Sequence, residues 1–124
     1  MTVATLNFIK IYVRDLSKMV AFYSNAFGFA VYARFSNDEF DEVLLRQEGQ
    51  AFLLGLLHWK DGRYEGAPST AGVVGMVTTD MEQAVAAAMD AGAVLKQAPF
   101  AVPGSIVSFV SDPEGNEVEF VQFA

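Results

Sequence analysis

The chain has 124 residues, 52% of them hydrophobic, and a formal net charge of −7. This length fits one domain (residues 1–124) with a sizeable core, and apolar surface remains for a pocket or a subunit interface. Its eight Lys and Arg are scattered among fifteen acids, which excludes the clustered basic surface that binds nucleic acid. No apolar run approaches the roughly 20 residues of a membrane helix, and the first residues do not resemble a secretory signal. We therefore expect a cytoplasmic protein with no nucleic-acid or membrane partner.

The first half of the chain has the pattern of a strand, a helix and three further strands. In residues 6–13 two sets of side chains alternate, as in a strand with two different faces: Ile9, Ile11 and Val13 on one face, Phe8, Lys10 and Tyr12 on the other. Asp15 is a candidate N-cap for a helix with apolar residues at helical spacing over 16–27, and Gly28 closes it. Residues 29–35, 41–47 and 50–58 are rich in strand-forming residues.

The second half repeats this pattern after a linker at 59–71, which separates module one (1–58) from module two (72–124). We expect a strand at 72–78, an N-cap at Asp80, a helix ending at Gly92, a strand at 93–98 and a loop at 99–103. A hairpin over 105–123 follows, with its turn at 112–116. Aligning Asp15 with Asp80 superimposes Phe8 on Val73, Lys10 on Gly75 and Tyr12 on Val77. The sequence therefore predicts an α+β fold of two βαβββ modules around a cleft.

Several short strings give the chain a resemblance to the vicinal-oxygen-chelate superfamily, which includes glyoxalases, bleomycin-resistance proteins and extradiol dioxygenases. The strings are Val13 to Leu16 running into Ala21 to Tyr23, Phe27 to Phe29, and Asp112 to Asn116 leading to Glu119. The resemblance covers nearly the whole length. It implies a ligand cleft between curved mixed sheets, but this fold hosts many chemistries.

In metal-dependent members of that superfamily, the first and last strand of each module each supply one metal ligand. The resemblance places these positions here at Phe8, Leu54, Val73 and Glu119, and Glu119 alone has a ligand-type side chain. A catalytic metal typically needs about three protein ligands. We therefore expect no metal and no cofactor.

Glu119 is the first candidate for a functional side chain, as a general base or a polar anchor for the ligand. It alternates with Val118 and Phe120. If those two residues pack under a helix, Glu119 faces the cleft beside Phe8 and Val73. The alternative is a partly solvated glutamate, or one paired with Lys10.

The predicted ligand-binding lining is mostly apolar, as is typical of small-molecule pockets. It consists of Phe8, Lys10, Tyr12, Leu54, Leu56, His58, Val73 and Val77. For the apolar members, the alternative is that their side chains fill the cleft. For His58, it is a solvent-exposed position at the end of a strand.

The leading functional hypothesis is a glyoxalase/bleomycin-resistance-like protein that binds a small, largely apolar or aromatic molecule without a catalytic metal. We also expect a homodimer, because the high apolar fraction is typical of such interfaces. Two alternatives stay open at this point. One is a metal-independent isomerase or lyase using Glu119 as base, and the other is a metal-dependent lyase or dioxygenase with misplaced ligands.

Overall fold

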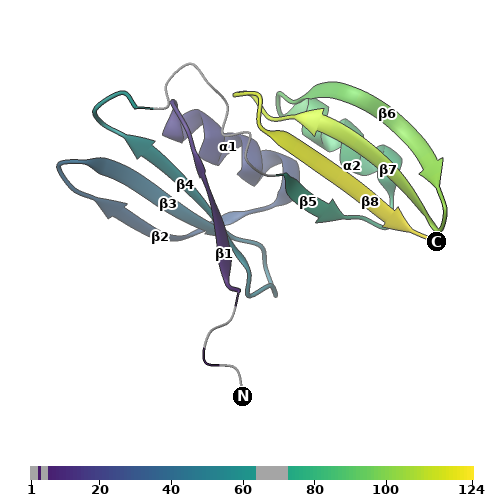
Figure 1. The fold of residues 1–124 in the computed structure, drawn as a ribbon, viewed down its shortest axis with the longest axis horizontal. Coiled ribbons are helices and arrows are strands. Elements are labelled where there is room, and N and C mark those ends of the chain that lie inside the picture. Colours follow the sequence, from purple (N-terminus) through teal and green to yellow (C-terminus); the bar gives the residue numbers. More distant parts are fainter. Residues whose placement is uncertain (1–2, 4–5, 64–72) are drawn as a thin grey trace.

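The computed structural model describes residues 3, 6–63 and 73–124, and Figure 1 shows the chain as a ribbon. Its elements in chain order are β1 (Phe8–Tyr12), α1 (Leu16–Phe27), β2 (Ala30–Ser36), β3 (Phe40–Arg46), β4 (Leu53–Trp59), β5 (Val74–Val77), α2 (Met81–Asp90), β6 (Val94–Val102), β7 (Ser105–Ser111) and β8 (Glu117–Phe123). In the part of the chain described, no helix is long and apolar enough to cross a membrane.

The strands form two separate four-stranded sheets with the same topology. Sheet one has the order β1-β4-β3-β2, and sheet two has the order β5-β8-β7-β6. In each sheet the first strand of the module pairs in parallel with the last, and the other pairs are antiparallel. The prediction of an α+β fold with two βαβββ modules is confirmed.

Both helices begin at the aspartates that the sequence indicated. The Asp15 side chain accepts a hydrogen bond from the Lys18 backbone N–H, and the Asp80 side chain accepts one from the Gln83 N–H. Such caps satisfy backbone donors that have no partner within the helix. Helix α1 ends at Gly28, whose φ of 72° is a left-handed conformation that glycine adopts without steric cost.

One hydrophobic core joins the two modules. It contains the helix-facing residues of both sheets together with the apolar sides of both helices, among them Ile11, Phe22, Leu56, Val85 and Phe120. The helices lie behind the sheets in the view of Figure 1. Each sheet therefore has one face packed on the core and one face turned away from the helices.

Several element boundaries differ from the sequence prediction, and the largest difference is in β6. The expected loop at 99–103 is largely strand, because β6 continues to Val102 with register irregularities between Leu95 and Gln97 and between Gln97 and Phe100. Such bulges let an edge strand accommodate Pro99 without losing its pairing. Trp59, expected in the linker, is the last residue of β4. Most of the predicted linker, and Gly72, lie outside the described residues.

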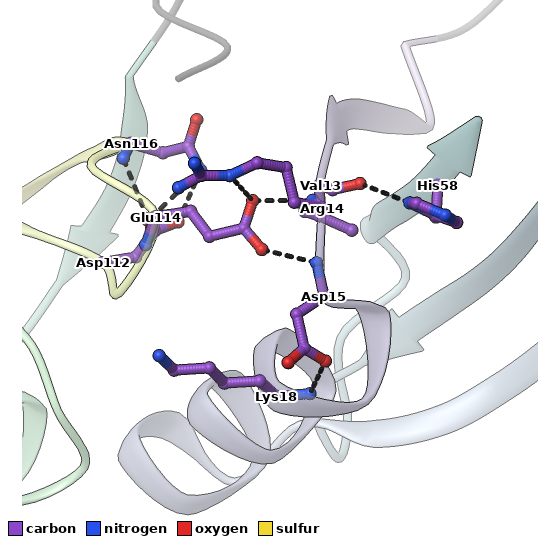
Figure 2. Close-up of polar contacts among 8 residues, drawn as sticks. All are labelled: Val13, Arg14, Asp15, Lys18, His58, Asp112, Glu114 and Asn116. Atoms are coloured by element: carbon purple, nitrogen blue, oxygen red, sulfur yellow. Dashed lines mark hydrogen bonds and ion pairs between the residues drawn. The ribbon is translucent and has the colours of Figure 1, made fainter. Parts of the chain in front are cut away.

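The turn between β7 and β8 fastens module two to the start of α1. The Glu114 carboxylate accepts hydrogen bonds from the backbone N–H groups of Arg14 and Asp15, both at 2.7 Å (Figure 2). Only 8% of the Glu114 side chain is exposed, and the Arg14 Nε lies 3.6 Å from the same carboxylate. A carboxylate at this position also complements the positive end of the helix dipole.

A buried polar network lies beneath this turn. The Asp112 carboxylate accepts hydrogen bonds from the Tyr23 hydroxyl at 2.8 Å, from the Asn116 amide, and from the backbone N–H groups of Glu114 and Asn116. Burial raises the pKa values of both Tyr23 and Asp112 above their usual ranges, and the neighbouring Asp112 contributes to the shift of Tyr23. The network connects α1 of module one to the hairpin of module two.

Candidate functional site

We call the side of each sheet that turns away from the helices its open face. In sheet one, β1 pairs in register with β4, so Phe8, Lys10 and Tyr12 lie on the same side as Leu53, Gly55 and Leu57. The opposite set on β1, which includes Ile9 and Ile11, packs on the core. The period-2 assignment of Phe8, Lys10 and Tyr12 to one face is therefore confirmed.

The open face of sheet two carries Glu119. Its chain neighbours Val118 and Phe120 are buried in the core, so Glu119 points the other way, as predicted. It pairs with Gly75 on β5 and with Phe109 on β7. A Cβ atom placed on Gly75 would meet nothing within 4 Å. Glu119 therefore borders an open space at the centre of sheet two.

The two other sequence-predicted residues of this face are Val77 on β5 and Val73, which immediately precedes that strand. Val73 is 43% exposed and Val77 is 71% exposed. Glu119 lies beside them in sheet two, whereas Phe8 belongs to sheet one. Phe8, Lys10 and Tyr12 thus share one open face, and Val73, Val77 and Glu119 share the other.

The placement of Leu54 and Leu56 on the open face of sheet one is wrong, although Leu54 also lines a cavity between the two modules. Both pair with core-facing residues of β1, Leu54 with Ile9 and Leu56 with Ile11, and both are buried in the core. Their neighbours Leu53 and Gly55 take the open-face positions. The run of leucines in β4 has no polar residue to mark a face, so its register depends on pairing with β1.

His58 also lies on the core side of its strand. It has the parity of Leu56, and its ring Nδ1 is 3.1 Å from the backbone carbonyl oxygen of Val13 (Figure 2). This contact ties the end of β4 to the residue that leads into α1. The predicted position of His58 at the cleft rim is wrong, because the parity that it shares with Leu56 is that of the core side.

An ion pair that the sequence analysis missed lies on the open face of sheet one. The Lys10 Nζ is 2.6 Å from the Glu42 Oε2. Glu42 pairs with Leu57 in the ladder between β3 and β4, which places it on the open face. The alternation of Glu42 with the buried Val43 could have indicated its face. Its contact with a residue 32 positions away was not visible in the sequence.

Aromatic side chains cluster beside this pair. Trp59 stacks on Phe40 with ring centroids 5.5 Å apart and meets Tyr12 edge-on at 5.9 Å. The Arg63 guanidinium lies 4.1 Å from the centre of the Trp59 ring. Trp59 and Phe40 were also missed by the sequence analysis, which assigned Trp59 to the linker. The open face of sheet one therefore combines aromatic surface with a lysine and a carboxylate.

The donor set does not fit the metal site of the metal-dependent relatives. Because Leu54 faces the core, the metal-ligand position on the open face of β4 corresponds to Leu53 or Gly55. Neither residue has a side chain that can bind a metal. Phe8 and Val73 have none either, so Glu119 is alone among the four positions. Within residues 6–63 and 73–124, no three His, Cys, Asp or Glu side chains group around a possible ion.

A cavity of about 340 Å³ lies where β1 and β4 of one module approach β5 of the other. Residues from both sheets line it, among them Phe52, Leu53, Leu54, Val73 and Gly75, and Gln47 and Gln50 add polar groups. Its size and mostly apolar lining are typical of a small-molecule site. This cavity and the two open faces are the parts of the structure best suited to hold a ligand.

Solved structures with the same fold span the whole chain. TnmS3, an antibiotic binding protein from Streptomyces sp. CB03234, matches with a TM-score of 0.80 at 21% identity, covering 100% of this chain and 99% of that one. A glyoxalase/bleomycin resistance protein/dioxygenase family enzyme from Burkholderia phytofirmans PsJN matches with a TM-score of 0.75 at 21% identity, covering 98% and 100%. A glyoxalase I mutant from Zea mays matches with a TM-score of 0.77 at 21% identity, but this chain covers only 46% of it.

The sequence itself matches one family model over most of its length. No curated protein matches significantly. The model of the Glyoxalase/Bleomycin resistance protein/Dioxygenase superfamily matches residues 5–120. At 21% identity the solved structures establish the fold alone, whereas the family model spans both modules. The chain therefore belongs to the Glyoxalase/Bleomycin resistance protein/Dioxygenase superfamily.

Proposed function

We propose that this protein binds a small, largely apolar or aromatic molecule against the open faces of its sheets, without a catalytic metal. The observation that carries the proposal is the composition of these faces. Phe8 and Phe35 are each about half exposed, and Val77 is 71% exposed. Apolar surface with a few polar groups is typical of ligand sites, and here Lys10, Glu42 and Glu119 supply those groups.

The relation to TnmS3 supports binding rather than a particular reaction. That protein is an antibiotic binding protein. Binding without chemistry also agrees with a donor set that cannot hold the metal of the metal-dependent relatives.

We further propose that two copies of the cytoplasmic chain form a homodimer in which the open face of sheet one meets the open face of sheet two of the partner. Exposed apolar residues on both faces support an interface. The charges complement each other as well. Along β1, β3 and β4 the exposed charges are Lys10 and Arg46, whereas β8 carries the exposed Glu117 and the partly buried Glu119 on the open face of sheet two. The ligand cleft would then lie between two chains.

The dimer can be tested by mass in solution. We expect light scattering at micromolar concentration to give twice the chain mass of 13.5 kDa. Replacement of the exposed Val77 by Lys should shift the protein toward monomer, because it adds a charge to an apolar contact. The matched change of Met89 to Lys on the exposed side of α2 should leave the mass unchanged. A wild-type protein that is monomeric under these conditions would rule out the dimer.

Binding and the role of Glu119 can be tested together with N-phenyl-1-naphthylamine, a neutral aromatic probe that fluoresces in apolar sites. We expect the wild-type protein to bind it, and Glu119→Gln to weaken binding about fivefold, because the glutamine oxygen still accepts a hydrogen bond from the probe N–H but without the assistance of a charge. Folding should be intact or slightly improved, since a carboxylate is costly to desolvate.

The matched control is Glu48→Gln, which changes an exposed residue of the turn between β3 and β4 and should leave probe affinity as it was. Absence of probe binding by the wild-type protein would count against the proposed function. Equal affinity of wild type and Glu119→Gln would remove Glu119 from the site while leaving binding in place.

A further inference from the structure

We propose that Lys10, held in place by Glu42, is an anion-binding group, and that the preferred ligand is an aromatic molecule carrying an anionic oxygen such as a carboxylate, phenolate or sulfonate. The inference rests on the proposed function and adds the chemical class of the ligand. It assigns a role to two residues that lie 32 positions apart and meet on the open face of sheet one.

The accessible end of the Lys10–Glu42 pair is the cation. The two side chains meet at 2.6 Å, yet the Lys10 side chain is 32% exposed and that of Glu42 only 8%. An approaching molecule therefore meets the ammonium group before the carboxylate. A lysine has three N–H donors, and its ion pair with the Glu42 carboxylate leaves donors for a ligand oxygen.

Stabilisation of the fold alone does not explain the Lys10–Glu42 pair. Burying a carboxylate costs several kcal/mol, and a buried ion pair typically contributes little net stability compared with apolar residues of the same volume. What the pair does achieve is to restrict a flexible lysine side chain to one place. A fixed cation binds an anion with less loss of side-chain entropy than a mobile one.

The surroundings favour an aromatic anion over a simple ion. The Lys10 Nζ lies 5.6 Å from the centre of the Phe8 ring, and Phe8 and Phe35 expose about half of their surface on the same face. Arg46, the other exposed charge along β1, β3 and β4, is also cationic and lies 4.6 Å from the Tyr32 ring. This open face is thus positive and aromatic on a chain whose net charge is −7.

Glu119 on the other open face sets the orientation of such a ligand. A carboxylate repels an anionic group and accepts hydrogen bonds from hydroxyl or N–H groups. The anionic oxygen would therefore lie at sheet one and any donor group at sheet two. Two polar groups of opposite character in an apolar cleft would discriminate between the ends of one molecule.

Two probes with the same ring system test the proposal: 8-anilino-1-naphthalenesulfonate, which is anionic, and the neutral N-phenyl-1-naphthylamine. We expect the wild-type protein to bind the anionic probe about tenfold more tightly than the neutral one, as for one charge-assisted hydrogen bond. Lys10→Met should abolish this preference and leave affinity for the neutral probe within about twofold. Lys18→Met, the same change at an exposed site on α1, should keep the preference.

Further variants separate binding from folding. Lys10→Met leaves the buried Glu42 carboxylate without its cation, and this can affect folding. The double variant Lys10→Met/Glu42→Gln removes both charges and keeps the net charge. It should also lose the preference for the anionic probe. Glu42→Gln alone should retain or increase it, because the cation remains and its counter-charge is gone. Failure of the wild type to bind either probe would overturn the proposed function. Binding of the neutral probe with no preference for the anion, or a preference that survives both Lys10 variants, would overturn this inference alone.

Discussion

Replacement of Asp112 by alanine is expected to lower the free energy of unfolding by about 3 kcal/mol or more at neutral pH. The change removes a carboxylate that is 2% exposed and accepts hydrogen bonds from Tyr23, Asn116 and the backbone of Glu114. The hydroxyl of Tyr23, which is fully buried, would lose its acceptor, and an unsatisfied buried donor keeps its full desolvation cost. Urea denaturation followed by circular dichroism measures the loss.

The matched control is Asp90→Ala at the exposed end of α2, which should change stability by less than about 0.5 kcal/mol. Adding Tyr23→Phe to Asp112→Ala should recover part of the loss, because the variant no longer buries an unpaired hydroxyl. If Asp112→Ala were as stable as Asp90→Ala, the turn would not hold the two modules together.

The stability difference between the wild-type protein and Asp112→Ala should depend on pH, in a direction set by the pKa of Asp112. Burial raises the pKa of Asp112 in the folded protein, so the folded state holds a proton at pH values where the unfolded chain has lost it. The stability from this proton is full below the unfolded pKa of about 3.9 and is lost as the pH rises through the folded pKa. The difference between wild type and Asp112→Ala should therefore be larger near pH 4 than at pH 7.

Replacement of Leu56 by alanine is expected to cost about 2–5 kcal/mol, the usual range for a leucine removed from a packed core. Leu56 is fully buried and belongs to the cluster that joins both sheets to the helices. The loss combines the transfer free energy of the removed methyl groups with the cavity that remains. Thermal or urea unfolding measures it, with binding of N-phenyl-1-naphthylamine to the folded fraction as a second readout.

The effects of Leu56→Ala on stability and on probe affinity distinguish a core residue from a ligand-binding residue. Leu6→Ala is the matched control, since Leu6 is 79% exposed and its truncation should leave stability within about 0.5 kcal/mol. For Leu56→Ala we expect reduced stability and nearly unchanged probe affinity. Unchanged stability with weaker probe binding would instead place Leu56 in the ligand site, as the sequence pattern had indicated.

The sequence by itself determined the fold and the faces of the strands that have mixed composition. Asp15 and Asp80 mark the starts of the two helices, because an aspartate before an apolar helical repeat satisfies free backbone N–H groups. The alternation of Lys10 with Ile9 and Ile11, and of Glu119 with Val118 and Phe120, assigned these two polar residues to their open faces. In each case a polar side chain beside buried apolar ones distinguishes the two sides of a strand.

Only the tertiary structure decided the faces of β4 and the partners of the polar residues. Leu53 to Leu57 are apolar apart from a glycine, so periodicity could not distinguish the two faces, and the hydrogen bonds with β1 placed Leu54 and Leu56 in the core. Lys10 meets Glu42, and Glu114 meets the start of α1, across long stretches of chain. Such contacts depend on how sheets and helices pack, whereas local patterns record only which residues prefer burial and which backbone shapes they favour.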